Sequence, residues 1–358
     1  MAHEELSPLN ITPGAIRFNT DSMKLEYFRI GMEGGSTSSY AGIGTMAAGE
    51  WVQITTDTPD IQTGGTRGVI GGGNNPANLT DIEFVTISTT GNATDYGDLT
   101  DARGALTALA SRTRALFACG YSPGDVNTID FITIASGGTA QDFGDNTASG
   151  NNGKRYSPIG ISNSTRGLIG GGQSVPGGTQ YTEITYVTIA QTGNSVAFGD
   201  LNAGGSDAGG CANSTRGIFT GGSPGHNVID FVTINTLGNA ADFGDLNAAT
   251  RAGHGGGASS TRGIFGGNNP TSDTIEYITI PTLGNALDFG NLTTTLHHGS
   301  ACSSVNRCIW SGGYRGGSKS NTIDYIQIQT LGNAIDFGDL TDDPHYHSAC
   351  SNGHGGLG

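Results

Sequence analysis

The chain repeats one pattern of about fifty residues along most of its length. Each copy opens on a Thr-Arg-Gly-type anchor and continues through a double glycine and a Thr-Ile-Asp-Tyr-type stretch. It ends on Gly-Asn-Ala and Asp-Phe-Gly-Asp-Leu. Successive anchors are 45 to 52 residues apart and begin at Thr66, Thr113, Thr165, Thr215, Thr261 and Asn306. Such a period is typical of arrays in which one supersecondary unit packs on the next, so the sequence predicts six similar units.

The fifth copy shows what one unit contains. Residues 274–280 alternate apolar side chains with Thr and Glu, the period of two expected of a half-buried strand. Short apolar stretches at 263–265 and 285–290 predict two more strands, and a fourth is expected within 251–259, ahead of the anchor. Four antiparallel strands in a unit of this length indicate one blade of a β-propeller, in which radial repetition protects sheet edges. The predicted fold class is therefore all-β, with a six-bladed β-propeller.

The repeat resembles two known patterns. The double glycine after a strand, with Arg251-Ala252-Gly253-His254 leading into the preceding strand, resembles a kelch repeat, although Phe289 stands where kelch blades usually carry Trp. The variant with TRG-GG, ID(Y/F)-TI and GNA-DFGDL resembles repeats in virion proteins of tailed phages, notably marine ones. This likeness covers residues 66–342. It implies a structural protein of the virion, made in the host cytoplasm.

Residues 1–57 share no repeat with the rest of the chain. Residues 14–28 predict two strands joined by a polar turn, and residues 49–54 predict a third. The order G-A-I-R-F-N-T-D, K-L-E and W-V-Q-I resembles a small β module of tailed-phage fibre and other virion proteins. That resemblance implies that the module attaches the protein to other virion proteins, with a contact made by Arg17, Phe18, Tyr27, Phe28 and Trp51.

The two ends of the repeat region predict how the propeller closes. Residues 345–353 match the leading strand of a blade, whereas the first copy has no recognisable leading strand of its own. We therefore expect the C-terminal strand to pair with residues 68–70, which would remove two open sheet edges. The predicted organisation is an N-terminal β attachment module at 1–57, a linker at 58–65 and a propeller at 66–358 closed by the C-terminal strand.

Charge and composition narrow the range of partners. The net charge is −15 and no basic patch is present, so a nucleic-acid partner is not expected. No apolar stretch approaches the length of a transmembrane helix, so membrane insertion is not expected. The five cysteines lack metal-site spacing, and Cys211, Cys302 and Cys350 fall at one inner-strand position, which indicates buried small apolar residues.

Several charged residues recur once in each copy. Sixfold repetition indicates architecture, because a functional site is normally a single feature placed on a scaffold. We expect these residues to form hydrogen bonds and ion pairs between strands or blades, including bidentate Arg–carboxylate contacts. The arginines are Arg67, Arg114, Arg166, Arg216, Arg262 and Arg307. One acidic series is Asp98, Asp145, Asp200, Asp245 and Asp339, and the other is Glu83, Asp130, Asp230, Glu276 and Asp324.

Features that occur once are the candidates for binding. Extra residues relative to the shortest copies lie at 151–156 and 173–181, and 313–319 carry local positive charge, although tolerated loop variation explains them equally. The candidate binding residues are Lys154, Arg155, Tyr156, Tyr181, Tyr314, Arg315 and Lys319. Histidines gather in the leading strands, where a structural role is favoured over a metal site. No nucleophile elbow, P-loop or H-E-x-x-H is present, so no catalytic residue, cofactor or metal is assigned and no enzyme is expected.

The resemblance and the repeat together predict a tail-fibre or baseplate-associated virion protein that displays its propeller to a host-surface glycan or protein. One alternative is a capsid decoration or head-fibre protein. Another is a glycan-active enzyme, which would place convergent unpaired carboxylates around one mouth of the propeller. The sequence leaves the oligomeric state open.

Overall fold

The structure is a computed structural model that describes residues 15–19, 24–30, 49–53, 66–247, 253, 255–268 and 272–357. The chain divides into two compact units, residues 1–62 and 63–358. The predicted linker, residues 58–65, lies outside the described residues. Among the described residues, no helix is long and apolar enough to cross a membrane.

The first unit contains an antiparallel sheet in the order β1-β2-β3. Its strands are β1 (Ile16–Asn19), β2 (Lys24–Ile30) and β3 (Gly49–Gln53). Ile16 is opposite Tyr27, and Phe28 is opposite Trp51. The three predicted strands are confirmed, and among the described residues β1 and β3 are the edges of this sheet.

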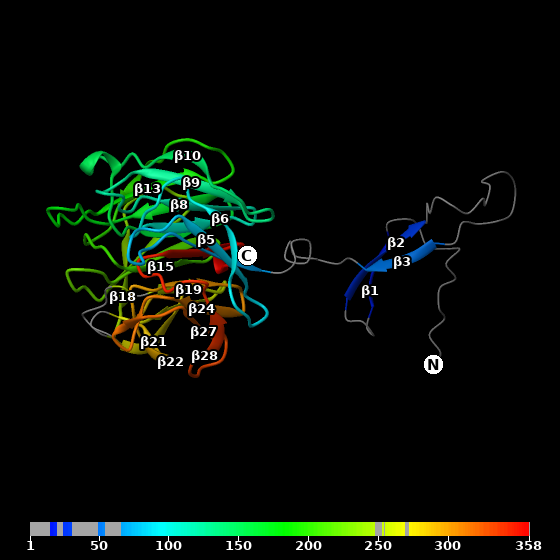
Figure 1. The fold of residues 1–358 in the computed structure, drawn as a ribbon. Helices are drawn as coiled ribbons and strands as arrows, with labels where there is room; N and C mark the ends of the chain where they lie inside the picture. The colour runs from blue at the N-terminus through cyan, green and yellow to red at the C-terminus, as the bar shows by residue number, and fades with distance from the viewer. Residues whose placement is uncertain are drawn as a thin grey trace, which may run out of the picture. The chain divides into compact units, whose positions relative to one another are not determined.

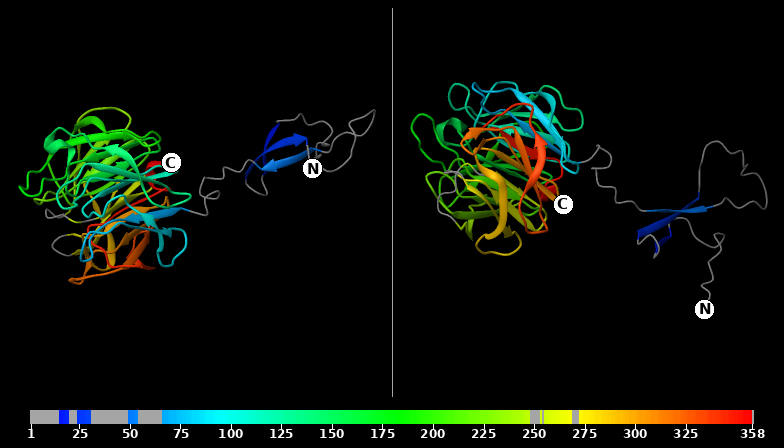
Figure 2. Two further views of the ribbon diagram at one scale, coloured as in Figure 1. Left: turned by 45° about the horizontal axis from the view of Figure 1, so that its top comes forward. Right: turned by 60° about the horizontal axis from the view of Figure 1, so that its bottom comes forward.

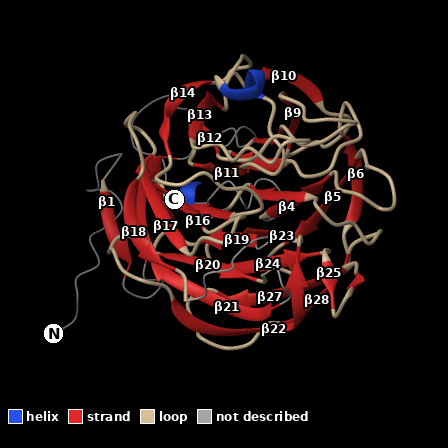
Figure 3. Cartoon of the chain, turned by 90° about the vertical axis from the view of Figure 1, so that its left-hand side faces the viewer, coloured by secondary structure: helices blue, strands red, loops and turns tan. Residues whose placement is uncertain are grey.

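The second unit is a six-bladed β-propeller, which confirms the predicted fold (Figure 1, Figure 3). Each blade has four antiparallel strands, and its innermost strand lies nearest the centre. From inside to outside, blade 1 consists of β29 (Ser348–Ser351), β4 (Arg67–Gly71), β5 (Asp81–Thr86) and β6 (Thr94–Asp98). Blade 2 consists of β7 (Thr107–Ala110), β8 (Arg114–Ala118), β9 (Thr128–Thr133) and β10 (Gln141–Asp145). Blade 3 consists of β11 (Ile159–Ser162), β12 (Arg166–Gly170), β13 (Glu183–Thr188) and β14 (Val196–Asp200).

Blades 4 to 6 repeat this order. Blade 4 consists of β15 (Gly209–Ala212), β16 (Arg216–Thr220), β17 (Val228–Thr233) and β18 (Ala241–Asp245). Blade 5 consists of β19 (Gly255–Ala258), β20 (Arg262–Gly266), β21 (Ser272–Thr279) and β22 (Leu287–His297). Blade 6 consists of β23 (Ser300–Ser303), β24 (Arg307–Ser311), β27 (Thr322–Gln327) and β28 (Ile335–Asp339). A small hairpin, β25 (Tyr314–Arg315) and β26 (Ser318–Lys319), extends the blade 5 sheet beyond β22. Two short 3-10 helices, η2 (Gly150–Gly153) and η3 (Gly355–Leu357), complete the described elements.

The C-terminal strand closes the propeller as predicted. β29 pairs antiparallel with β4, so that Ser348 is opposite Gly71 and Ser351 is opposite Gly68 (Figure 2). Blade 1 therefore takes its inner strand from the end of the chain and its other three strands from the beginning of the repeat region. This pairing joins blades 6 and 1 and leaves β4 with a hydrogen-bonded neighbour on both sides.

The inner strands come so close to one another that one position in each holds only Ala or Gly. A Cβ added to Gly160 would lie 2.5 Å from Thr107 Oγ1, and one added to Gly210 would lie 2.6 Å from Ile159 Cγ2. Convergence on the centre therefore selects very small side chains, and packing at this density admits no extra atoms. The six equivalent residues are Ala108, Gly160, Gly210, Gly256, Ala301 and Ala349.

The outer edge of each blade is covered by a turn from the next blade. Around β28, the Gly91 N–H donates to Phe337 O (2.9 Å), and the Ala93 N–H donates to Asp339 O (2.8 Å). Asn92 Oδ1 accepts the Asp339 N–H at 3.1 Å. The Gly-Asn-Ala part of the repeat thus occupies backbone groups that a free edge strand would expose.

The hydrophobic core is shared between neighbouring blades rather than enclosed within them. One cluster contains Val69 of blade 1 with Phe117 and Ile132 of blade 2. Another joins Ile70 of blade 1 to Ile309 of blade 6, across the closure. A single blade could not bury its apolar faces alone, which is why several repeats are needed for stability.

Candidate functional site

The recurring arginines connect each blade to the next. In every blade the Arg Nη1 atom donates to the carbonyl oxygen of an isoleucine in the following blade, over 2.7 to 3.1 Å. The guanidinium carbon also lies 4.7 to 5.1 Å from the centre of an aromatic ring in its own blade. The inter-blade role is confirmed. The expected carboxylate partners are wrong, because these arginines use a carbonyl oxygen and a ring face instead.

The acids of the third strands also act between blades. Asp130 of blade 2 accepts the Thr100 hydroxyl at 2.8 Å, and Asp324 of blade 6 accepts the Thr293 hydroxyl at 2.7 Å. Asp230 accepts the Asn202 N–H at 2.9 Å. Thr100 and Asn202 follow the outer strands of the preceding blades, and Thr293 lies within β22, the outer strand of blade 5. The repeated polar residues therefore serve assembly.

Two of the candidate binding residues are buried. Arg155 is 1% exposed, and its Nη2 atom lies 2.5 Å from a Glu183 carboxylate oxygen. Arg315 is 7% exposed, and its Nη1 atom lies 2.6 Å from Asp324. Both were expected at a loop surface, and the structure corrects this: each guanidinium neutralises a third-strand acid inside the protein, because a buried charge requires a partner. Sequence analysis missed a third such pair, Arg103 with Asp130 at 2.9 Å.

The other candidates remain accessible to different degrees. Lys154 is exposed, whereas Tyr156, Tyr181, Tyr314 and Lys319 are half-buried. The Tyr181 ring lies over the Arg155 guanidinium, with the guanidinium carbon 3.8 Å from the ring centre. Lys319 Nζ donates to Asn75 Oδ1 at 3.4 Å, across the boundary between blades 6 and 1.

In the first unit, Arg17 is exposed on β1. Phe18 also lies on β1, Tyr27 and Phe28 on β2, and Trp51 on β3. These five candidate attachment residues therefore occupy all three strands of one small sheet.

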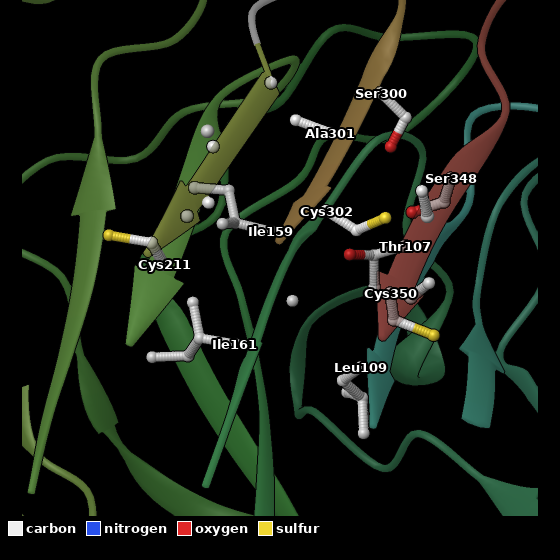
Figure 4. Close-up of a pocket in the computed structure, with 18 of the residues that line it drawn as sticks. Thr107, Leu109, Ile159, Ile161, Cys211, Ser300, Ala301, Cys302, Ser348 and Cys350 are labelled. Carbon is white, nitrogen blue, oxygen red and sulfur yellow. The ribbon is translucent and has the colours of Figure 1, made fainter. Parts of the chain in front are cut away.

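A central cavity of about 140 Å³ lies between the inner strands of all six blades. Figure 4 shows side chains of these strands around it, among them Thr107, Cys302 and Ser348. Cys211, Cys302 and Cys350 line it, and burial raises the pKa of each thiol, which keeps them protonated. Their predicted place on the inner strands is confirmed.

The end of the chain covers one end of this cavity. A Cβ added to Gly355 would lie 2.1 Å from the Ser259 carbonyl oxygen, so η3 packs against the ends of the inner strands. His354 Nε2 lies 3.0 Å from Ala110 O, Arg112 donates to Leu357 O, and the Leu357 side chain is buried. In Figure 3 this short helix lies at the centre of the blades.

A belt of backbone hydrogen bonds surrounds the opposite end, which we call the mouth. Two residues before each inner strand, the backbone has a left-handed φ between 50° and 71°. Each of these residues donates its N–H to the carbonyl oxygen of its counterpart in the preceding blade, for example Ser157 to Ala105 and Ala105 to Tyr346, both at 2.8 Å. The six bonds form a closed circle. The mouth belt consists of Ala105, Ser157, Asp207, Gly253, His298 and Tyr346.

Three of the six belt positions hold Ala, Ser or Tyr in a conformation that favours Gly, Asn, Asp or His. Such strain costs on the order of 1 kcal/mol at each residue and persists only where surrounding structure imposes it. The belt therefore holds side chains at fixed positions around the mouth.

Aromatic and imidazole rings gather on one side of the mouth. His298 stacks on Tyr346 with ring centres 4.1 Å apart, and His297 stacks on Tyr314 at 4.9 Å. Tyr346 also contacts Tyr156 at 6.0 Å. The aromatic cluster consists of Tyr121, Tyr156, His297, His298, Tyr314, His345 and Tyr346. It brings together two predicted candidates, Tyr156 and Tyr314, from loops more than 150 residues apart in the sequence.

Burial sets the charge state of the groups at the mouth. Burial, together with the neighbouring His297 and His345, lowers the pKa of His298 to about 4. It raises the pKa of Tyr156 to about 12. Burial also raises the pKa of Asp207, against the effect of a 2.6 Å hydrogen bond from the Ser157 hydroxyl. At neutral pH the His298 imidazole and the Tyr156 phenol are therefore uncharged.

This arrangement suits binding. In the part of the chain that the structure describes, no group of three or more His, Cys, Asp or Glu side chains is placed to hold a metal ion. Asp207 is the one carboxylate among the described residues that line the cavity. Flat rings and a few polar atoms around a concave opening match the composition of small-ligand sites.

Sequence analysis missed the mouth belt and most of the aromatic cluster. Asp207 and His298 precede their inner strands by two residues, like Gly253, and Asp, His and Gly are residue types that tolerate a left-handed φ. Alignment of the repeats on the inner strands, rather than on the anchors, would have revealed that shared position.

No protein-family model and no curated protein matches the chain.

Proposed function

We propose that this protein is a structural protein of a tailed-phage virion that displays its propeller for binding to the host surface. In this proposal it is associated with the tail fibre or baseplate. Residues 1–57 contact other virion proteins, and the mouth of the propeller faces the host.

The observation that supports the display role most directly is the contrast between repeated and unrepeated residues. The recurring arginines, third-strand acids and Gly-Asn-Ala turns all take part in contacts between blades. The aromatic cluster occurs once, at one end of the cavity. Function is commonly a single site placed on a regular scaffold, which makes the mouth the favoured contact surface.

The first unit supports the attachment role. Its three-stranded sheet ends in two edge strands, β1 and β3, and Ile16 on β1 is 64% exposed. An open sheet edge offers unpaired backbone groups to a strand of another protein, which is a common mode of docking. The phage-module resemblance of residues 14–54 agrees with this role.

The proposal is tested by locating the protein in the particle. Electron microscopy of virions with antibody against residues 66–358 should place the propeller at the tail tip or fibre. Label on the capsid would instead support a decoration or head-fibre protein, and the absence of the chain from purified virions would refute the proposal.

Truncation tests the division of labour. A protein lacking residues 1–57 should fold as a soluble propeller but fail to join particles assembled without the full-length chain. Normal incorporation of the truncated protein would make the propeller the anchor and would overturn the assigned roles.

Glycan cleavage is the competing activity. Most glycosidases act through a pair of carboxyl groups, and Asp207 stands alone among the described residues that line the cavity. We therefore keep binding as the proposal. Release of reducing sugar from host polysaccharide by the purified protein would replace it with the enzymatic alternative.

A further inference from the structure

We propose that the mouth of the propeller binds the terminal unit of a neutral saccharide, with the aromatic cluster as its platform. This inference rests on the proposed host-surface binding and names the ligand class and the residues that contact it.

The first argument is the asymmetry of the mouth. Around one half, the rings of Tyr346, His298 and Tyr156 contact one another, while blades 4 and 5 contribute the carboxyl side chain of Asp207 and the backbone of Gly253 to the belt. Among the described residues, the opening of the cavity is thus lined by rings on one side and by a short side chain and backbone on the other. A ligand in that space would contact ring faces on one flank and backbone and a carboxyl group on the other.

The second argument is the chemistry of the rings. Tyr156, Tyr314 and His297 are half-buried, so part of each ring remains accessible. The stack of His297 on Tyr314 is nearly parallel, at 10°, which makes a flat surface. Tyrosine and neutral histidine present an apolar face and a polar edge. The C–H faces and hydroxyl groups of a sugar ring require that combination.

The third argument is the presence of polar groups on the wall of the cavity. Asp207 and Ser157 both line it, and the Ser157 hydroxyl donates to Asp207 Oδ1 at 2.6 Å. These two side chains give the mouth a donor and an acceptor for the hydroxyl groups of a ligand.

The fourth argument concerns charge and access. The chain carries a net charge of −15, which disfavours the approach of sialylated or sulfated glycans. The histidines of the cluster are neutral at pH 7, because burial lowers the pKa of His297, His298 and His345. Because η3 covers the far end of the cavity, a ligand can enter from one side only. This geometry selects a chain end over an internal unit.

The test is binding of the full-length protein to an array of neutral oligosaccharides that end in glucose, galactose, mannose or N-acetylglucosamine, with sulfated and sialylated counterparts alongside. We expect binding to a neutral subset. Saturation-transfer NMR with the free terminal sugar should then show transfer from aromatic protons.

Variants locate the site. Tyr314→Ala and His297→Ala should each weaken binding at least about tenfold, and Tyr314→Phe, which keeps the ring face, should retain most of it. Tyr186→Ala is the matched control, because Tyr186 is an equally half-buried tyrosine outside the aromatic cluster. Its affinity should equal that of the wild type. Circular dichroism and melting temperature confirm that each variant is folded.

Three results would overturn the inference: no binding to any neutral glycan, binding only to anionic glycans, or neutral binding that Tyr186→Ala reduces as much as the mouth variants do. The proposed function fails separately. A protein that binds neutral glycans through the mouth but is absent from virions would sustain this inference and refute the virion role. A protein that is present in virions but binds no neutral glycan would sustain the virion role and refute this inference.

Discussion

Arg307 donates a hydrogen bond to the carbonyl oxygen of Ile87 over 3.1 Å, although the two residues lie 220 positions apart in the sequence. The Arg307 guanidinium carbon also lies 4.7 Å from the centre of the Tyr325 ring. Arg307 belongs to blade 6 and Ile87 to blade 1. The contact that joins successive blades elsewhere is therefore also present between blades 6 and 1, where the end of the chain closes the propeller.

Replacement of these arginines should destabilise the propeller by a similar amount in each blade. Arg216→Ala, Arg262→Ala and Arg307→Ala each remove one hydrogen bond to a buried carbonyl and one cation–π contact. We expect a loss of about 1–3 kcal/mol in the free energy of unfolding, measured by denaturant titration. Lys154→Ala, at an exposed loop position, should change stability little. A large loss confined to one blade would show that the arginines are not equivalent.

Two glycines of blade 6 separate backbone strain from close packing. Gly338 and Gly332 have nearly equal φ, 149° and 151°, but a Cβ on Gly338 would lie 2.5 Å from the Gly91 carbonyl oxygen, whereas Gly332 has open space. Gly332→Ala should cost about 1 kcal/mol through its backbone conformation alone. Gly338→Ala should cost clearly more, roughly 2–4 kcal/mol, because blade 1 must move. Equal losses in thermal or denaturant unfolding would contradict the close approach.

Removal of the C-terminal strand should open the propeller. Deletion of residues 344–358 takes away β29 and η3, exposes the edge of β4 and removes the buried Leu357 and Cys350. We expect the melting temperature to fall by on the order of 10 °C or more. Deletion of residues 1–57, which belong to the other compact unit, is the control and should leave the melting temperature of the propeller nearly unchanged. Equal melting temperatures for the two deletion variants would show that β29 does not hold the propeller closed.

Stability should fall on mild acidification. Burial lowers the pKa of His347 to about 3 and that of His354 to about 4. Because the unfolded chain binds these protons near pH 6.5 and the folded chain does not, the stabilisation is complete above pH 6.5 and declines as the pH falls towards 4.

The variant His347→Gln isolates this effect. In the wild type, His347 should lower the free energy of unfolding by up to about 1.4 kcal/mol for each unit by which the pH falls between 6.5 and 4. The variant should lack this contribution. Subtracting the pH profile of the variant from that of the wild type also cancels the opposite contribution of buried carboxyl groups such as Glu83, whose pKa is raised by burial. Identical pH profiles of unfolding free energy would count against a neutral buried His347.

The repeat made the number of blades, the strand order and the closure by residues 348–351 predictable, because each of these follows from the phase of the pattern alone. The partners of the arginines were not predictable. In each copy an acid and an aromatic residue are both available to the arginine, and spacing along the chain does not decide between a carboxylate and a carbonyl oxygen on the next blade.

The site was less predictable than the fold. Arg155 and Arg315 lie in insertions, which usually face solvent, yet Glu183 and Asp324 draw them inside. Tyr156 and Tyr314 were recognised as candidates, but His297, His298 and Tyr346 were not joined to them. Tyr156, His298 and Tyr346 come from separate connections between blades, whereas Tyr314 lies in the hairpin between β24 and β27 of blade 6. Their proximity exists only once the belt has closed.

The belt at the mouth has a further consequence for how such a chain can arise. Each of its hydrogen bonds is donated from one blade to the preceding blade, and so are those of the turns that cover the outer edges. Each arginine donates in the other direction, to the following blade. One flank of a blade is therefore complementary to the opposite flank of any other, in the manner of a heterologous interface that closes into a cycle. The linkers specify the order of the blades but not the fit between them. A single ancestral blade would already possess both halves of the joint, and gene duplication would only convert a cyclic assembly of separate subunits into one continuous chain.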